Sequence, residues 1–213
     1  MRKVTKEYNV YNFDELDKDI QEKLIEDESK YQCDFYCETF LQNDITNDAE
    51  IILEKTFNNS KIENLQVYYD FSYSQGSGAC MQFDIYLEDV NKKLKIFTDK
   101  EMEIFKNYGS LIKIIHNDNF YCHEKTFGID DMNLYYSIDY ALQCEEITKN
   151  KYEKLEEKIA KTFDILKELI IKMNSELAKD GYSIIEDEES FKISALEFLQ
   201  EQEYLKDGSV FYV

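Results

Sequence analysis

The segment LQVYYDFSYSQGSGACMQFDIYL, residues 65–87, decides the fold, because two strand-like runs flank its pair of glycines. Residues 65–73 alternate in polarity and are rich in aromatic side chains, which favour β-strands. Residues 81–87 alternate again and place every second, apolar side chain on one face. Glycines between such runs suit a turn with positive φ. We therefore predict an antiparallel hairpin with one buried face.

Other runs extend this sheet. Residues 92–98 predict one more short strand, and residues 111–115 and 120–123 flank an Asn- and Asp-rich stretch that suits a second hairpin turn. Residues 132–140 fit either a strand or a short helix. The fold class predicted is α+β, with an antiparallel sheet of hairpins at about residues 65–125 packed by helices from both ends of the chain.

The first part of the chain predicts a strand and three helices. Residues 4–11 read as a strand, and Asn12 offers a helix N-cap with Glu15 as its capping-box partner. Apolar residues then recur at helical spacing up to Leu24. Residues 31–57 also predict helix, broken in two by the Asn- and Asp-rich run at 43–48.

The last part of the chain predicts a long helix over residues 147–180, with Gly181 as its stop. The long helix either lies across the sheet or projects in part, and its more charged first half is a candidate contact for a dimer or for a partner protein. A final helix at 191–204, a turn at Asp207-Gly208 and a strand at 210–213 follow. Residues 1–213 are expected to form a single domain.

The charge is the strongest functional signal. The chain carries 45 acidic and 25 basic residues, a net charge of −20, and Arg2 is its only arginine. Arginine is the usual reader of phosphate and guanine, so direct binding of nucleic acid is not expected, and neither is binding to an anionic membrane. No apolar run approaches the length of a membrane span. The long-range attraction of this surface is for basic partners.

The glycine turn is the first candidate site. Its residues Gln75, Gly76, Ser77 and Gly78 could present backbone N–H groups to an anion, but the pattern lacks the lysine and following helix of phosphate loops. A hairpin turn is the simpler interpretation, with contact to a partner as the alternative. The second candidate partner surface is the acidic run Glu186, Asp187, Glu188 and Glu189.

Cysteine and histidine offer little chemistry. The five cysteines include no CxxC pair, which predicts reduced thiols in a cytoplasm. A metal site or a Cys–His pair would need convergence among the residues Cys33, Cys37, Cys80, His116, Cys122 and His123, whose spacing is irregular. We therefore expect no catalytic residue, no metal and no cofactor.

The motif Ser-Gln-Gly-x-Gly-Ala-Cys at 74–80 resembles small acidic proteins encoded by phages and prophages. The resemblance extends to the Phe-x-Glu-Leu helix start at 13–16, the hairpin at 116–123 and the terminal Tyr-x-x-Asp-Gly at 204–208. That group more often has aspartate where Ser77 stands, so no acid or metal role transfers to this loop. The resemblance implies a bacterial host and a role against host defence, such as that of anti-CRISPR proteins.

These observations together predict a non-enzymatic acidic inhibitor. Its target would be a CRISPR-Cas-type host defence nucleoprotein, whose basic nucleic-acid site the acidic surface would block. One alternative is a small hydrolase or nucleotide-binding protein that acts on a defence signal, with a pocket near the glycine turn lined by His116 or His123. Another is an antitoxin-like partner protein that forms a homodimer through the long helix.

Overall fold

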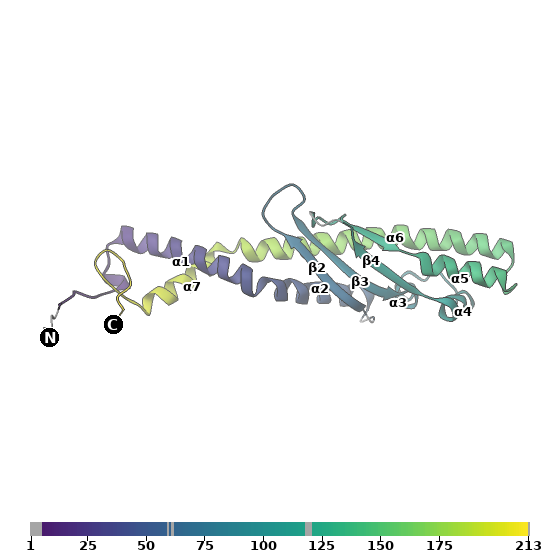
Figure 1. The fold of residues 1–213 in the computed structure, drawn as a ribbon, viewed down its shortest axis with the longest axis horizontal. Helices are drawn as coiled ribbons and strands as arrows, with labels where there is room; N and C mark the ends of the chain where they lie inside the picture. The colour runs from purple at the N-terminus through teal and green to yellow at the C-terminus, as the bar shows by residue number, and fades with distance from the viewer. Residues whose placement is uncertain (1–5, 59, 61, 118–120, 213) are drawn as a thin grey trace, which may run out of the picture. The chain divides into compact units, whose positions relative to one another are not determined.

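The computed structural model describes residues 6–58, 60, 62–117 and 121–212 (Figure 1). Contacts divide the chain into two compact units. Unit 1 combines Met1–Leu41 with Ser183–Val213, and unit 2 is Gln42–Tyr182. The predicted α+β class is confirmed by helices together with an antiparallel four-stranded sheet. That the chain forms a single domain stays a prediction.

The sheet of unit 2 has the strand order β2-β3-β4-β5, and every neighbouring pair is antiparallel. Its strands are β2 (Ile62–Asp70), β3 (Gly78–Tyr86), β4 (Leu111–His116) and β5 (Phe127–Asp130). The predicted hairpin is confirmed, since β2 pairs with β3 from Ile62↔Ile85 to Asp70↔Gly78. Residues 71–77 connect the two strands, so the connection is a loop longer than the predicted turn.

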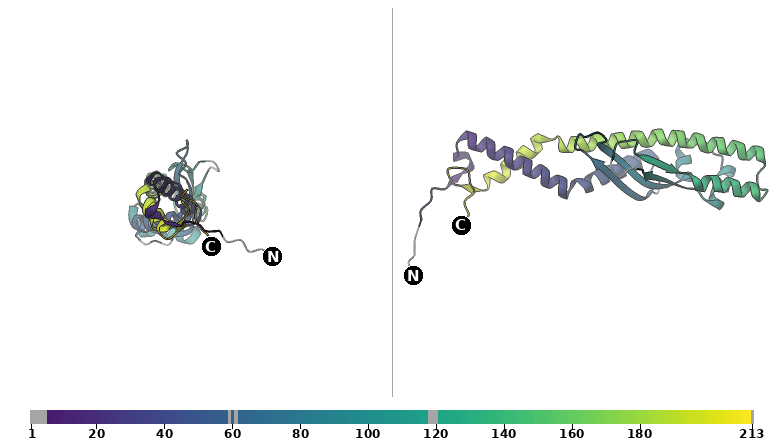
Figure 2. Two further views of the ribbon diagram at one scale, coloured as in Figure 1. Left: turned by 90° about the vertical axis from the view of Figure 1, so that its left-hand side faces the viewer. Right: turned by 45° about the horizontal axis from the view of Figure 1, so that its top comes forward.

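One face of β3 is fully covered, as the alternation predicted. The side chains of Met81, Phe83 and Ile85 are buried, whereas those of Gln82 and Asp84 are partly exposed. Behind the strands, as drawn in Figure 1 and in the right-hand view of Figure 2, run helices α2 (Leu41–Phe57) and α6 (Lys149–Ile185). Apolar burial on one face therefore fixes the strand register.

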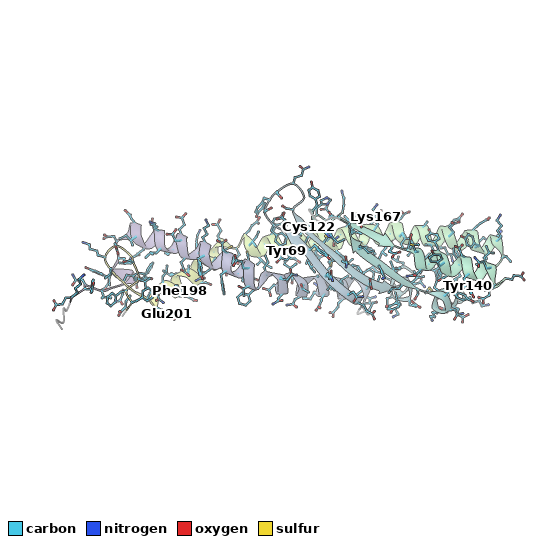
Figure 3. The ribbon with its side chains drawn as sticks, in the orientation of Figure 1. Tyr69, Cys122, Tyr140, Lys167, Phe198 and Glu201 are labelled. Atoms are coloured by element: carbon cyan, nitrogen blue, oxygen red, sulfur yellow. The ribbon has the colours of Figure 1, made fainter. Side chains whose placement is uncertain are left out.

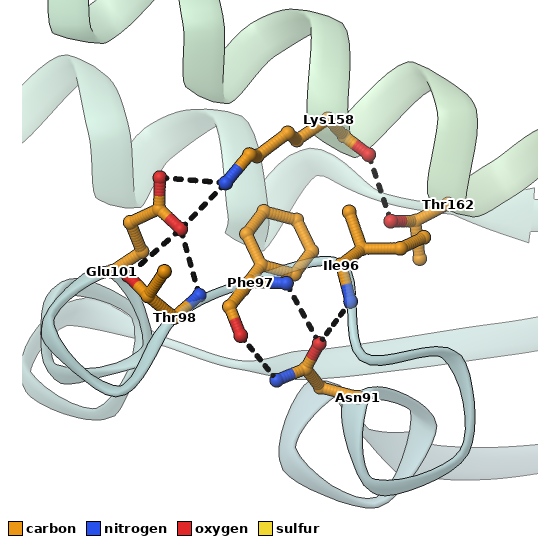
Figure 4. A network of polar contacts seen from close by, with 7 residues as sticks. All are labelled: Asn91, Ile96, Phe97, Thr98, Glu101, Lys158 and Thr162. Carbon is orange, nitrogen blue, oxygen red and sulfur yellow. Dashed lines mark hydrogen bonds and ion pairs between the residues drawn. The ribbon is translucent and has the colours of Figure 1, made fainter.

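Two of the strands predicted for the sheet, residues 92–98 and 120–123, are wrong. Residues 92–98 begin inside helix α3 (Leu87–Leu94), which ends at Lys95 in a left-handed conformation. The side chain of Asn91 then holds the chain that follows, since it accepts hydrogen bonds from the N–H groups of Ile96 and Phe97 at 2.9 Å (Figure 4). Asn91 thus satisfies backbone groups that a strand would have paired.

The partner of β4 is β5, not the predicted residues 120–123. Residues 118–120 lie outside the described residues, and residues 121–126 carry no strand. Helix α4 (Asp99–Tyr108) precedes β4, and helix α5 (Met132–Gln143) follows β5. The open question at residues 132–140 is thus resolved in favour of a helix.

The helix break predicted at 43–48 is also wrong. Helix α1 (Lys18–Thr39) ends next to Phe40, and α2 continues through the Asn- and Asp-rich run. Burial explains the difference, because Ile45 and Ala49 are fully buried at helical spacing. Tertiary packing therefore outweighs the preference of asparagine and aspartate for turns.

Helix α6 passes through its predicted stop. A Cβ atom on Gly181 would lie 2.1 Å from Cζ of Phe71, so glycine here makes room for an aromatic ring rather than ending the helix. In the thinner first half of the helix, Leu155 and Ile159 are already fully buried. That stripe therefore packs within unit 2, and dimerisation through the long helix stays a prediction.

Unit 1 is built from both ends of the chain. Its elements are β1 (Tyr11–Asn12), the 3₁₀ turn η1 (Phe13–Glu15), α1, α7 (Glu188–Gln200) and β6 (Glu203–Tyr204), with β1 antiparallel to β6. The predicted capping box is confirmed, with the N–H of Asn12 donating to Glu15 at 2.8 Å. It caps the 3₁₀ turn, however, and α1 begins only at Lys18.

The ends of unit 1 differ from the predicted strands. Of residues 4–11, the first two lie outside the described residues, and only Tyr11 belongs to a strand. The predicted turn at Asp207-Gly208 is present, since Leu205 N–H donates to Ser209 O at 2.8 Å, and Val210 forms a bridge to Tyr204. The core of this unit contains Phe13, Leu16, Leu199 and Tyr204.

A polar network in unit 2 joins α6 to the start of α4 (Figure 4). Lys158 Nζ donates to both carboxylate oxygens of Glu101, at 2.7 and 2.8 Å, and the Thr98 N–H donates to the same carboxylate at 2.7 Å. Burial acts to raise the pKa of Glu101, but the bonds from Lys158 and Thr98 prevail and hold it below its usual value.

We expect Glu101→Gln to lower the free energy of unfolding by about 1–2 kcal/mol at pH 7, because a charge-assisted bond is lost. The lowered pKa makes this stabilisation complete above the unfolded pKa of about 4.3. It is lost as pH falls through the lower folded value. Urea titrations from about pH 7 to about pH 3 should therefore show the two proteins converging at the acid end. The exposed neighbour substitution Glu103→Gln should show no such trend.

Within the described residues, no helix combines the length and the apolar character that crossing a membrane requires.

Candidate functional site

The glycine loop of unit 2 uses its glycines for packing. Gly76 and Gly78 have φ of 103° and 144°, as a turn interpretation predicts. A Cβ atom on Gly76 would lie 1.9 Å from the ring of Tyr121, and one on Gly78 would lie 3.2 Å from the Cα of His123. The Cys122 N–H also donates to the Gly76 carbonyl at 2.9 Å. The two glycines therefore let residues 121–123 pack directly on the hairpin loop.

The serine hydroxyl groups of the same loop form hydrogen bonds with the carboxylate of Asp70. Asp70 accepts from the N–H of Ser72 at 2.8 Å, and the hydroxyls of Ser74 and Ser77 lie 3.3 and 3.4 Å from it. The bonds from Ser72, then those from Ser74 and Ser77, lower the pKa of Asp70. Gln75 is exposed at the tip. The polar side chains of the loop thus bind one another and order its conformation.

In each of the two histidines, one ring nitrogen forms a hydrogen bond with a backbone group. His116 stacks on Tyr68 with ring centroids 4.2 Å apart, and its Nε2 lies 2.9 Å from the carbonyl oxygen of Tyr121. His123 Nδ1 accepts from the Lys125 N–H at 3.2 Å. These contacts position the segment after β4, where Figure 3 shows Cys122.

The candidate cysteines and histidines are divided between the two units. Cys33 and Cys37 belong to unit 1, whereas the other candidates, Cys80, His116, Cys122 and His123, belong to unit 2. Within the described ranges, no three His, Cys, Asp or Glu side chains gather as a metal site would require. Burial and the Cys33 thiol raise the pKa of Cys37 to about 11, and burial raises that of Cys80 to about 12. Thiols with such pKa values are poor nucleophiles at neutral pH.

The acidic run at 186–189 lies at the start of α7 in unit 1. All four side chains, those of Glu186, Asp187, Glu188 and Glu189, are exposed. Asp187 is the N-cap of the helix and accepts from the Ser190 N–H at 3.1 Å, and Glu188 pairs with Lys192 at 3.1 Å. Acidic residues here also complement the helix dipole. Part of this run therefore stabilises α7, and part faces solvent.

One member of that run borders a cavity of about 630 Å³ between α1 and α7, here called the acidic groove. Its charged lining consists of the exposed residues Glu22, Glu26, Lys30, Asp34, Glu188 and Lys192. Among the described residues no ion pair is found for the three α1 carboxylates. Four carboxylates and two ammonium groups thus give the rim a net negative charge.

The floor of the acidic groove is apolar. It is lined by the half-buried residues Ile25, Cys33, Ile185 and Phe191, together with the buried Ser29. The ring of Tyr36 lies 6.0 Å from that of Phe191, and Gln32 Nε2 donates to Ser194 O at 3.4 Å. These contacts hold α1 against α7 beside the groove. An apolar floor with a charged rim is typical of a binding site for an amphipathic ligand.

Sequence reasoning found one wall of the groove and missed the other. The run at 186–189 stands out because its acids are adjacent. The α1 carboxylates Glu22, Glu26 and Asp34 are not adjacent in sequence, and only their spacings of four and eight residues mark a shared helix face. The contact of α1 with α7, in which Gln32 bonds to Ser194 at a sequence separation of 162 residues, could not be predicted from the pattern of either helix.

No family model, curated protein or solved structure matches this chain.

Proposed function

We propose that this chain is a non-catalytic protein that binds, through its acidic surface, a basic nucleic-acid-binding site of another protein and blocks it. One observation carries the proposal: three carboxylates of α1 and one of α7 face the same groove over an apolar floor. The excess of 45 acidic over 25 basic residues leaves at least part of the acidic side chains without a basic partner. Such a surface attracts basic proteins and speeds their association.

The finer proposal concerns the partner. The resemblance of the 74–80 motif to phage and prophage proteins favours a host defence nucleoprotein of the CRISPR-Cas type as the target. Its guide and target channel is lined by basic side chains that bind phosphate groups. Carboxylates on a rigid surface would occupy the same positions as phosphates and exclude the nucleic acid. The partner would thereby lose its activity without any reaction catalysed by this chain.

Competition tests this function. The protein is immobilised, incubated with lysate of the bacterial host, and washed, and bound proteins are then eluted with a short duplex DNA or an RNA of similar length. A partner that uses its nucleic-acid site should be released by the polyanion, and the purified partner should bind either nucleic acid or this chain. A ternary complex of partner, nucleic acid and this chain would contradict the proposal.

A further inference from the structure

The acidic groove has a regular charged edge. Glu22, Glu26, Lys30 and Asp34 follow one another at intervals of four residues along α1, so they form a single row on the helix surface. The row spans about 18 Å at 1.5 Å per residue. Carboxylates occupy three of its four positions. A ligand lying along this edge would therefore meet negative charge at both ends of the row.

The floor exists because small residues stand in the next row. Ser29 and Cys33 lie four residues apart on α1, facing the α7 side of the groove. Larger side chains there would fill the space between the helices. Across the groove, Phe191 and Ile185 add apolar surface. The groove is therefore long, apolar at its base and anionic along its edge.

These features point to one occupant. Extending the proposed function, on which this inference rests, we propose that the acidic groove binds an amphipathic helix of the partner protein, with leucine-like side chains on the floor and lysine or arginine against the rim. A helix packed between two others is a common way to bury an exposed apolar floor. The exposed carboxylates Glu22, Glu26 and Asp34 supply the complementary charge.

Two other occupants of the groove are considered: a second copy of this chain, which its charge disfavours, and the chain's own first residues, which the experiment tests. A second copy of this chain would bring a net charge of −20 to an anionic rim and would be repelled. The chain's own residues 1–6 contain Arg2, Lys3 and Lys6. By its charge, this segment could compete with the partner helix for the groove.

The fluorescence of an introduced tryptophan can report peptide binding in the groove directly, because the chain has no tryptophan of its own. Phe191→Trp places a single indole on the floor, and Tyr136→Trp, on α5 of unit 2, is the matched reporter away from it. The ligand is a tryptophan-free synthetic peptide of about 18 residues, long enough for about five helical turns, with leucine on one face and lysine on the other. A peptide of the same composition, with its leucines spread around the helix, is the control.

Three variants separate the contributions of charge and floor. Glu22→Gln, Glu26→Gln and Asp34→Asn together neutralise the rim, whereas Glu157→Gln, Asp164→Asn and Glu168→Gln together make the same charge change on the exposed side of α6. Ser29→Leu fills the floor and leaves every charge in place. Circular dichroism confirms that each variant folds before its affinity is measured.

The expected result is a peptide-dependent change in the signal of the Phe191→Trp protein and none in that of the Tyr136→Trp protein. Rim neutralisation should weaken binding about tenfold or more, the α6 control less than about twofold, and filling the floor about tenfold. If the rim variant and the α6 variant weaken binding equally, or if the scrambled peptide binds as tightly as the amphipathic one, the groove is not the site. Either result would leave the proposed charge-driven function intact. Binding that occurs only after removal of residues 1–6 would assign the groove to the chain's own segment and overturn the inference as well.

Discussion

Asn174→Ala is expected to lower the free energy of unfolding by about 2–4 kcal/mol. Asn174 is a fully buried side chain on α6 that satisfies two backbone groups in unit 2. Its Oδ1 accepts from the Met81 N–H at 3.0 Å, and its Nδ2 donates to the Glu124 carbonyl at 3.1 Å. Alanine would leave both groups without a partner and would also open a small cavity.

Thermal unfolding measures this loss. For a chain of this size, we expect the Tm to fall by about 5–12 °C. Lys172→Ala, an exposed change two residues away on the same helix, should shift stability by no more than about 0.5 kcal/mol. Because Asn174 joins α6 to both β3 and the 121–126 segment, equal Tm values for Asn174→Ala and Lys172→Ala would refute its role as the link between them.

Gly181→Ala is the second large expected effect, and its sign depends on Phe71. Alanine in a helix is favoured over glycine by about 1 kcal/mol. At this position, however, its Cβ would lie 2.1 Å from Cζ of a Phe71 ring that also contacts Tyr182. Displacing the ring from a packed core costs about 1–3 kcal/mol. We therefore expect Gly181→Ala to destabilise the protein by up to about 2 kcal/mol, the balance of these two effects.

A double-mutant cycle checks the cause. In a Phe71→Ala background the obstacle is gone, so Gly181→Ala should now stabilise the protein by up to about 1 kcal/mol. Denaturant titration of the four proteins gives the coupling energy. If Gly181→Ala has the same effect in both backgrounds, then Phe71 does not explain why glycine stands there.

The hairpin could be predicted because its pattern is local. Alternation from 81 to 87 and the two glycines depend on neighbouring residues, and so does the capping box of Asn12 with Glu15. The errors arise where a distant residue decides. Gly181 stands inside a helix, where it leaves room for the Phe71 ring, and the 43–48 run stays helical because Ile45 and Ala49 are buried. Such tertiary effects override local propensity and leave no local trace.

The candidate site likewise has features that the local sequence predicts and features that it does not. Exposure of the acids at 186–189 follows from their charge, and positive φ at Gly76 and Gly78 follows from the turn. The groove, by contrast, needs α1 beside α7, a pairing between opposite ends of the chain. Its floor depends on small side chains at Ser29 and Cys33, which look unremarkable in the sequence. Only the three-dimensional arrangement gives these residues a shared surface.

The acidic surface matters to function only if a partner responds to its charge. Salt screens exposed charges over about 8–10 Å at physiological ionic strength, and more strongly at higher salt. A complex held by carboxylates against lysine and arginine therefore weakens as salt rises, whereas one held by apolar contacts alone does not.

The most direct measurement is the Kd of this chain for the partner obtained by polyanion elution, at about 50 mM and about 300 mM salt. Our account predicts binding about tenfold or more weaker at the higher salt, mainly through slower association. A Kd that is the same at both salt concentrations would contradict it.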